Sequence, residues 1–196
     1  MSLTTDSSQT DILLHYLQRE RDHLVGTLDG LGEYDVRRPV TPSGTSLLGL
    51  VKHVASVELG YFCDSLGRPH GIELAWDDEQ AFEANADMWA TPEESREMLL
   101  DLYRRSWALG DANIRELGLD APALVPWWSE EQRDTTVGRL VVHMLDETAH
   151  HAGHADVVRE TIDGRGGRDH DAVGDEEWWS SYVARVQAAA DAHRQD

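Results

Sequence analysis

The sequence predicts an all-α fold, a four-helix bundle with a long crossover between its second and third helices, plus a C-terminal helix. Apolar residues recur at helical spacing in four long stretches, and strand signals are almost absent. The crossover, residues 67–90, is long enough for the second and third helices to run parallel. The 196 residues suffice for one domain with a sizeable core. We expect a single domain over 1–196, with its core at 11–164 and a linker and terminal helix at 165–196.

The first two helices are marked by leucine spacing and by their caps. Leucines recur at intervals of three, four and seven over residues 11–31, which is the stripe of an amphipathic helix. The segment "PVTPSGTS" then breaks the pattern, and Thr45 or Ser46 can cap a second helix over 47–66. Gly67 follows as its stop signal.

The third helix has a clear start signal in the sequence. The acidic, weakly periodic stretch 71–90 is expected to be a connection with at most a short helical turn. Thr91 then stands as N-cap and Pro92 at the first helical position, with glutamates in the first turn. A helix is therefore predicted from there to about Leu117.

The fourth helix follows a loop that contains "VPWWSEEQRD". It is predicted from about Thr136 to Ile162 and ends at Gly164. A glycine-rich linker comes next, and "EWWSSYVARVQAAADAHR" predicts a terminal helix that packs its Trp, Tyr and Val side chains against the bundle.

Charge and composition exclude several classes of partner. The formal charge of -20 repels phosphate backbones and anionic membrane surfaces, so neither nucleic acid nor a membrane is expected as a partner. No apolar run approaches the roughly 18 residues of a membrane span. Cys63 is the single cysteine and no export signal is evident, so we expect a cytoplasmic protein.

The segment "DETAHHAGHADVVRE", residues 146–160, concentrates titratable groups on the fourth helix. A helical wheel places Glu147 and His151, spaced i and i+4, one turn apart on the inward face. His154 lies near Glu147, whereas His150 points away. A carboxylate beside a core needs a cation, a proton or a metal, and the imidazoles nearby favour a metal.

A third ligand candidate lies on the second helix. His53 stands in a row of apolar residues, where a lone histidine usually has a structural role. A helix with several histidines, like the fourth one, is likewise more often a solvent-exposed face than a metal site. Together with Glu147 and His151, however, it makes three protein ligands. Catalytic zinc sites use three and leave one position for water or substrate.

Two motifs resemble those of the DinB-like family of metal-binding four-helix bundles, over residues 11–164. They are "GLVKHVASVELGYF", with His53, and "HMLDETAHHAGHADVVRE", with Glu147 and His151. The sequence looks closest to an actinobacterial branch that is related to proposed mycothiol-dependent S-transferases. The resemblance implies an up-down-down-up bundle, and it implies homodimers in many members.

The same resemblance implies one divalent metal ion. In the similar mycothiol-dependent maleylpyruvate isomerases, a His, Glu, His trio holds zinc. Many DinB-like proteins carry His where Glu147 stands, so this site is more anionic. Carboxylate with imidazole suits zinc first, with nickel, manganese or iron as alternatives.

The leading functional hypothesis is a metal-dependent transferase of a low-molecular-weight thiol, of mycothiol type, to an electrophile. The ion would lower the pKa of the thiol so that a thiolate persists at neutral pH. His154 is the catalytic candidate, as a proton acceptor, a fourth ligand or an orienting group. Trp127 and Trp128 are expected on the substrate side, closing over an apolar substrate, unless they only cap the bundle end.

Three alternatives stay open at this point. The same site could activate water for hydrolysis, or the ion could simply staple a non-catalytic metal-binding or stress-response bundle. A ferritin-like di-metal centre would use the E-x-x-H motifs Glu20 to His23 and Glu147 to His150. The wheel counts against it, because both of these histidines fall outside the inward stripe.

Overall fold

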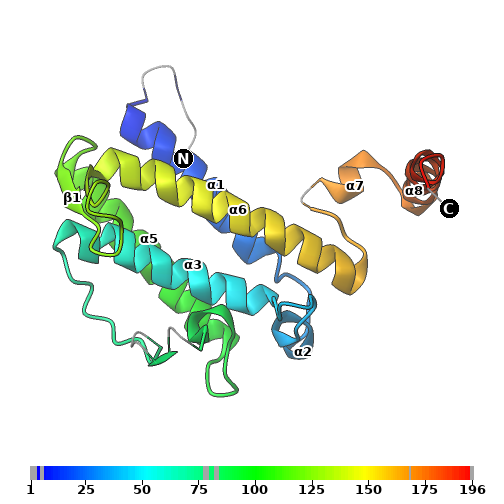
Figure 1. Cartoon of the computed structure of the whole chain (residues 1–196), viewed down its shortest axis with the longest axis horizontal. Helices are drawn as coiled ribbons and strands as arrows, with labels where there is room; N and C mark the ends of the chain where they lie inside the picture. The colour runs from blue at the N-terminus through cyan, green and yellow to red at the C-terminus, as the bar shows by residue number, and fades with distance from the viewer. Residues whose placement is uncertain (1–3, 5–6, 77–79, 82–83, 168, 195–196) are drawn as a thin grey trace.

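The computed structural model describes residues 4, 7–76, 80–81, 84–167 and 169–194, and it is mainly helical (Figure 1). Its α-helices are α1 (Gln9–Gly26), α2 (Glu33–Arg37), α3 (Leu47–Phe62), α5 (Arg96–Leu117), α6 (Val137–Asp163), α7 (His170–Val173) and α8 (Glu176–Asp191). Shorter elements are the 3-10 helices η1 (Asp64–Leu66) and η2 (Ala86–Met88) and the strands β1 (Pro122–Leu124) and β2 (Asp134–Thr136). The predicted helical class is confirmed, and each of the four predicted bundle helices has a counterpart.

α3 starts after Ser46, one of the two predicted capping residues, and α6 starts directly after Thr136, the predicted beginning of the fourth helix. The Ser46 hydroxyl accepts a hydrogen bond from the backbone N–H of Gly49, and the Thr136 hydroxyl accepts one from that of Arg139. At its other end α6 is closed by Gly164, whose φ of 80° is the left-handed conformation that glycine adopts without strain.

Three predicted boundaries are wrong. The second helix was expected to reach residue 66, but α3 ends at Phe62 and the 3-10 helix η1 follows it. The third predicted helix was expected to begin at Thr91, but α5 begins one turn later, with Ser95 as its N-cap. The reason is that Glu94 folds back and accepts a hydrogen bond from the Thr91 backbone N–H, which closes a turn ahead of the helix. The first helix, expected to reach residue 31, ends at Gly26, and residues 27–30 form a turn in which Gly30 has a φ of 76°.

A two-stranded hairpin departs from the all-α expectation. β1 and β2 pair antiparallel, with Pro122 opposite Thr136 and Leu124 opposite Asp134. Strands of three residues are too short to produce an alternating pattern in the sequence. The hairpin matters for the site because it folds the loop with Trp127 and Trp128 back toward the start of α6.

The terminal helix α8 was expected to pack its aromatic side chains against the bundle, and this is wrong. None of its residues is buried, and Figure 1 shows α7 and α8 apart from the long helices. Its aromatic rings contact one another instead: Trp178 stacks on Tyr182 at 5.2 Å, and Trp179 stacks on His170 of α7 at 4.7 Å.

The four long helices, α1, α3, α5 and α6, lie side by side, with α3 in contact with both α5 and α6 (Figure 1). Lys52 binds Glu94 near the start of α3 and α5. Near their ends, the Asn113 side chain donates to the carbonyl of Phe62. These two contacts show that α3 and α5 run in the same direction.

Contacts between α1 and α6 order the remaining pair in the same way. His23 binds Asp156, and one turn further along both helices Arg159 donates to the backbone carbonyl of Thr27. α1 and α6 therefore run parallel to each other. The start of α1 shares a buried cluster with the end of α3, so these two helices are antiparallel.

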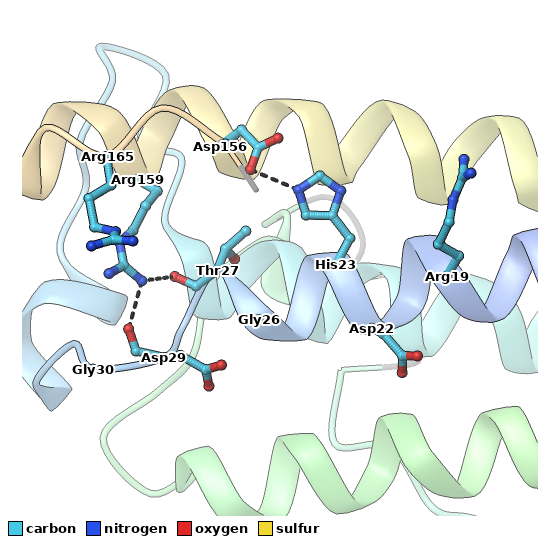
Figure 2. A pocket seen from close by; sticks show the side chains of 11 residues that line it. Arg19, Asp22, His23, Gly26, Thr27, Asp29, Gly30, Asp156, Arg159 and Arg165 are labelled. Carbon is cyan, nitrogen blue, oxygen red and sulfur yellow. Dashed lines mark hydrogen bonds and ion pairs between the residues drawn. The ribbon is translucent and has the colours of Figure 1, made fainter. Parts of the chain in front are cut away.

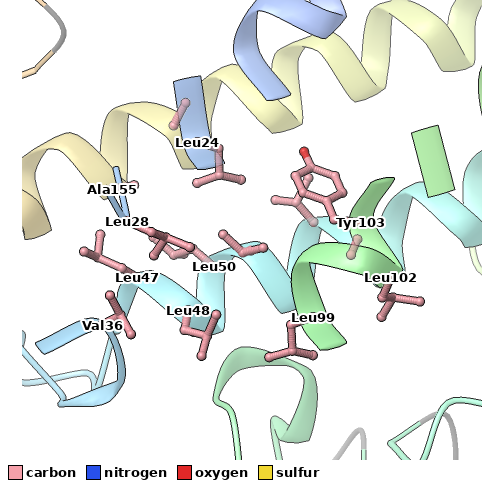
Figure 3. Close-up of a cluster of buried hydrophobic side chains, with 14 of the residues drawn as sticks. Leu24, Leu28, Val36, Leu47, Leu48, Leu50, Leu99, Leu102, Tyr103 and Ala155 are labelled. Atoms are coloured by element: carbon pink, nitrogen blue, oxygen red, sulfur yellow. The ribbon is translucent and has the colours of Figure 1, made fainter. Parts of the chain in front are cut away.

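The apolar core fills the space between these helices. Figure 3 shows the cluster at the end where α3 begins, which includes Leu24, Leu28, Leu47, Leu50, Leu99 and Tyr103. A charged group crosses the core beside it. The side chain of Arg21 is fully buried and binds the carboxylates of Glu58 on α3 and Asp111 on α5, the latter at 2.9 Å.

Replacing Glu58 with Ala should strongly destabilise the fold, because it leaves the buried Arg21 guanidinium with Asp111 as its one carboxylate partner. We expect the free energy of unfolding to fall by about 3–5 kcal/mol. The exposed Arg68 and Glu116 pair, with 2.7 Å between its closest atoms, is the matched control. Glu116→Ala should cost much less, because water screens an exposed ion pair. Denaturant unfolding of both variants gives the comparison, and equal losses would contradict the role assigned to the buried pair.

Candidate metal centre

The three residues predicted as metal ligands come together between α3 and α6. His53 comes from α3, and Glu147 and His151 come from α6, with one potential ligand atom of each lying within 4.8 Å of the others. The Glu147 Oε1 atom lies 3.1 Å from His151 Nε2 and 3.5 Å from His53 Nε2. One carboxylate oxygen thus sits between two imidazole nitrogens from different helices.

The position of the three side chains suits a site that receives small molecules. Their exposed fractions are 18% for His53, 29% for Glu147 and 12% for His151. The group is therefore reachable from solvent while most of its surroundings are protein. Two imidazole nitrogens and one carboxylate oxygen form a donor set that fits a divalent transition metal and leaves a further coordination position open.

Asp87 is a member of the site that the sequence did not predict. Its Oδ2 lies 2.6 Å from His53 Nδ1, on the far side of the imidazole ring from Glu147. Histidines that bind metals commonly donate their second ring N–H to a carboxylate, which fixes the tautomer and the ring orientation. Asp87 lies on η2, within the acidic stretch expected to be only a connection, and no spacing rule links it to His53.

The backbone of η2 reaches α3 because Gly49 has no side chain. A Cβ atom at Gly49 would lie 2.0 Å from the carbonyl oxygen of Met88, far inside contact distance. Gly49 is one turn before His53, and Met88 directly follows Asp87. The close approach of these two backbones therefore carries the Asp87 carboxylate to the imidazole.

A buried lysine anchors the crossover on both sides of Asp87. The ammonium of Lys52 donates to both carboxylate oxygens of Glu94 at 2.9 Å and to the carbonyl of Trp89 at 3.0 Å. It also lies 3.9 Å from the centre of the Trp76 ring, a cation-π contact. The indole N–H of Trp76 in turn donates to Ser56 on α3.

The surroundings of His53 and Glu147 shift the pKa values of these two groups strongly. Burial alone would lower the pKa of His53, but hydrogen bonds to Asp87 and Glu147 raise it to about 9. Hydrogen bonds from His151 and His53 hold the pKa of Glu147 well below its usual range. In the metal-free protein near neutral pH, a protonated His53 thus lies between two carboxylates, an environment that favours a cation.

His154 and His150 lie outside this group. Both are exposed, and the His154 ring centre is 5.6 Å from that of His151 and 4.3 Å from that of His150. The expectation that His150 points away holds. The ligand atoms of His154 do not join those of the three converging residues.

Trp127 and Trp128 lie at the interface between α3 and α6, which also contains the three converging residues. The indole N–H groups of both donate to the hydroxyl of Tyr61, at 3.2 and 3.0 Å. Tyr61 is eight residues after His53, or roughly 12 Å along the helix. The His143 ring, one turn before Glu147, contacts Tyr61 and Trp128. Tyr61 and His143 were not singled out from the sequence, because their importance comes from loop residues folded onto them.

The ferritin-like alternative finds no second ligand set in the part of the chain that is described. His23 binds Asp156 at 2.9 Å, and His150 is exposed. Among the described residues, the group containing His53 is the one that brings three potential ligands together.

A cavity of about 770 Å³ lies elsewhere, between the end of α1, α6 and the linker after it (Figure 2). None of the three converging ligand residues lines it. Arg159 in its wall donates to the carbonyls of Thr27 and Asp29, so this cation already serves to close the end of α1. No described helix has the length and apolar character needed to cross a membrane.

Gly49→Ala should weaken metal binding by pushing η2 and Asp87 away from His53. We expect a loss of zinc affinity on the order of 10- to 100-fold, the same as for Asp87→Asn. Gly26→Ala is the control, because a Cβ there meets nothing within 4 Å. Competition with a chromophoric chelator measures the affinities. Unchanged binding in both Gly49→Ala and Asp87→Asn would show that the carboxylate does not support the site.

Zinc affinity should rise with pH below the pKa of His53. Because this pKa is raised to about 9, the metal must displace a proton at neutral pH. We expect about a tenfold gain in affinity per pH unit between about pH 6 and 8, and a shallower slope in Asp87→Asn. Calorimetry in buffers of different ionisation enthalpy measures the proton release. A flat profile would contradict the assigned protonation of His53.

Comparisons with known proteins agree with this architecture. No curated protein matches the sequence. A crystal structure described as the conserved protein of a locus from Enterococcus faecalis is similar in fold, with a TM-score of 0.63 at 17% identity over 81% of this chain and 99% of that chain. The family model for mycothiol S-transferases matches residues 12–164 and so includes all three converging residues. The resemblance indicated by the two histidine motifs is thereby confirmed, and the chain belongs to the DinB-like mycothiol S-transferase family.

Proposed function

We propose that this protein transfers a low-molecular-weight thiol of mycothiol type to an electrophile, with a divalent metal ion held by His53, Glu147 and His151. The observation that carries the proposal is the convergence of these three side chains on one point between α3 and α6. Membership of the mycothiol S-transferase family supports the thiol and the reaction class. Zinc is the first choice of metal, with nickel, manganese or iron as alternatives.

The ion, Asp87 and Glu147 are assigned different roles. A bound divalent ion supplies a Lewis acid that keeps a thiol sulfur as thiolate at neutral pH. Asp87 accepts the Nδ1–H of His53 and so keeps the Nε2 lone pair directed at the site. Glu147 lowers the net charge of the centre relative to an all-histidine site.

The nucleophilic sulfur comes from the cosubstrate and not from the protein. Cys63 is buried at the end of α3, and burial together with the nearby carboxylates of Asp64 and Glu58 raises the pKa of its thiol to about 11. Such a thiol is not ionised near neutral pH and is not exposed to an electrophile.

His154 is the proposed proton acceptor for the incoming thiol. Slight burial, followed by the neighbouring His150 and His151, lowers the pKa of His154, which favours the neutral imidazole. Trp127 and Trp128 are proposed to contact the apolar part of the electrophile. Trp127 lies beside the same interface between α3 and α6 and is 54% exposed, so part of its ring is available for contact with a substrate.

We further take the four long helices as one up-down-down-up bundle domain. The parallel contacts of α3 with α5 and of α1 with α6, and the antiparallel packing of α1 on α3, support this arrangement. In such a bundle a metal site lies between facing helices, as the cluster here does.

The decisive test combines metal content with thiol turnover. Protein purified without chelator should carry about one zinc per chain, and His53→Gln and Glu147→Ala should lose it. With mycothiol and a small fluorogenic electrophile, the same variants should lose at least about 100-fold in rate. Cys63→Ala is the control and should keep the rate.

The other outcomes distinguish the competing functions. Product formed equally well without any thiol would mean hydrolysis by a metal-activated water. One metal per chain with no turnover, and unfolding on chelation, would mean a metal that staples the bundle. Absence of metal after reconstitution would overturn the proposal.

A further inference from the structure

We propose that His150 and His154 form a second, two-ligand binding site for a divalent transition metal on the exposed face of α6. The two residues are spaced i and i+4, and their ring centres lie 4.3 Å apart. Both side chains are exposed, so their rotamers can adjust to a shared ion without disturbing the core.

The ring nitrogens of this pair are available for coordination. Among the described residues, no hydrogen bond or ion pair engages either imidazole, in contrast to His53 and His23, whose rings bind carboxylates. Among the aromatic rings of the described residues, those of His150 and His154 contact each other and the ring of His151.

The chemistry of two imidazoles with otherwise open positions selects a class of metal. Two nitrogen donors from one helix suit Cu²⁺, Ni²⁺ and Zn²⁺, with Cu²⁺ bound most tightly, and water completes the coordination. Two protein ligands give weaker binding than three ligands with a carboxylate. His150 and His154 should therefore bind metal only after the centre at His53 is occupied, when metal is in excess.

The second site is separate from the candidate centre but adjacent to it. The ring of His151 lies 5.6 Å from the rings of both His150 and His154, and no atom of this pair belongs to the three converging ligands. Metal bound at the pair would engage His154, which the proposed transferase mechanism uses as proton acceptor. The binding proposal itself does not depend on that mechanism.

Copper titration of the full-length protein tests the site. In His53→Gln, where the first centre has lost a ligand, we expect one Cu²⁺ to bind at the pair. Adding His150→Gln or His154→Gln should weaken this binding by at least about tenfold. Adding His193→Gln instead is the matched control, because His193 is exposed and has no histidine one turn away, and its effect should stay within about twofold.

Two readouts separate the outcomes. Calorimetry gives the stoichiometry, and the nitrogen hyperfine pattern in electron paramagnetic resonance reports imidazole ligands. Circular dichroism checks that each variant keeps its helices. The proposal is overturned if His53→Gln binds no Cu²⁺, or if His150→Gln and His154→Gln bind it as His193→Gln does. Either result leaves the function proposed for the His53 centre untouched.

Discussion

The fully buried guanidinium of Arg21 constrains how three helices can be arranged. It joins Glu58 on α3 and Asp111 on α5, so rotation of α1, α3 or α5 would break an ion pair of a buried charge. On α3, Glu58 and His53 are five positions apart, or roughly 140° around the helix. Holding Glu58 toward α1 and α5 therefore turns His53 toward α6. An ion pair in the core thus sets the direction from which one candidate ligand enters the metal site.

The candidate ligands could be predicted from the sequence because their geometry is local. Glu147 and His151 lie one turn apart on the same helix, and His53 belongs to an apolar row that must face inward. Asp87 could not be found in this way, since its contact with His53 depends on how a crossover of irregular structure settles on α3. The same holds for Tyr61, whose partners are supplied by a loop more than sixty residues later in the chain.

For the fold too, features set by local contacts could be predicted, and features set by distant contacts could not. Helices capped by Ser46 and Thr136 begin where predicted, because a cap is a contact between residues three apart. The start of α5 was missed, since Glu94 is committed both to the turn at Thr91 and to Lys52 on another helix. The sequence of α8 has the amphipathic pattern of a packed helix, but the helix is exposed. Such a pattern does not specify which surface, if any, the apolar side chains cover. It also lies outside the region that the family model covers.

Among the described residues, η2, which carries Asp87, packs on α3 over a shorter stretch than α5 and α6 do. Segments of this kind open at lower free energy than a bundle core does. Opening would withdraw the carboxylate from His53 while the side chains of Glu147 and His151 stay in place on α6. The lifetime of a bound ion would then be set by how often η2 opens. Amide exchange in η2 and metal release would share one rate, well above the rate of global unfolding.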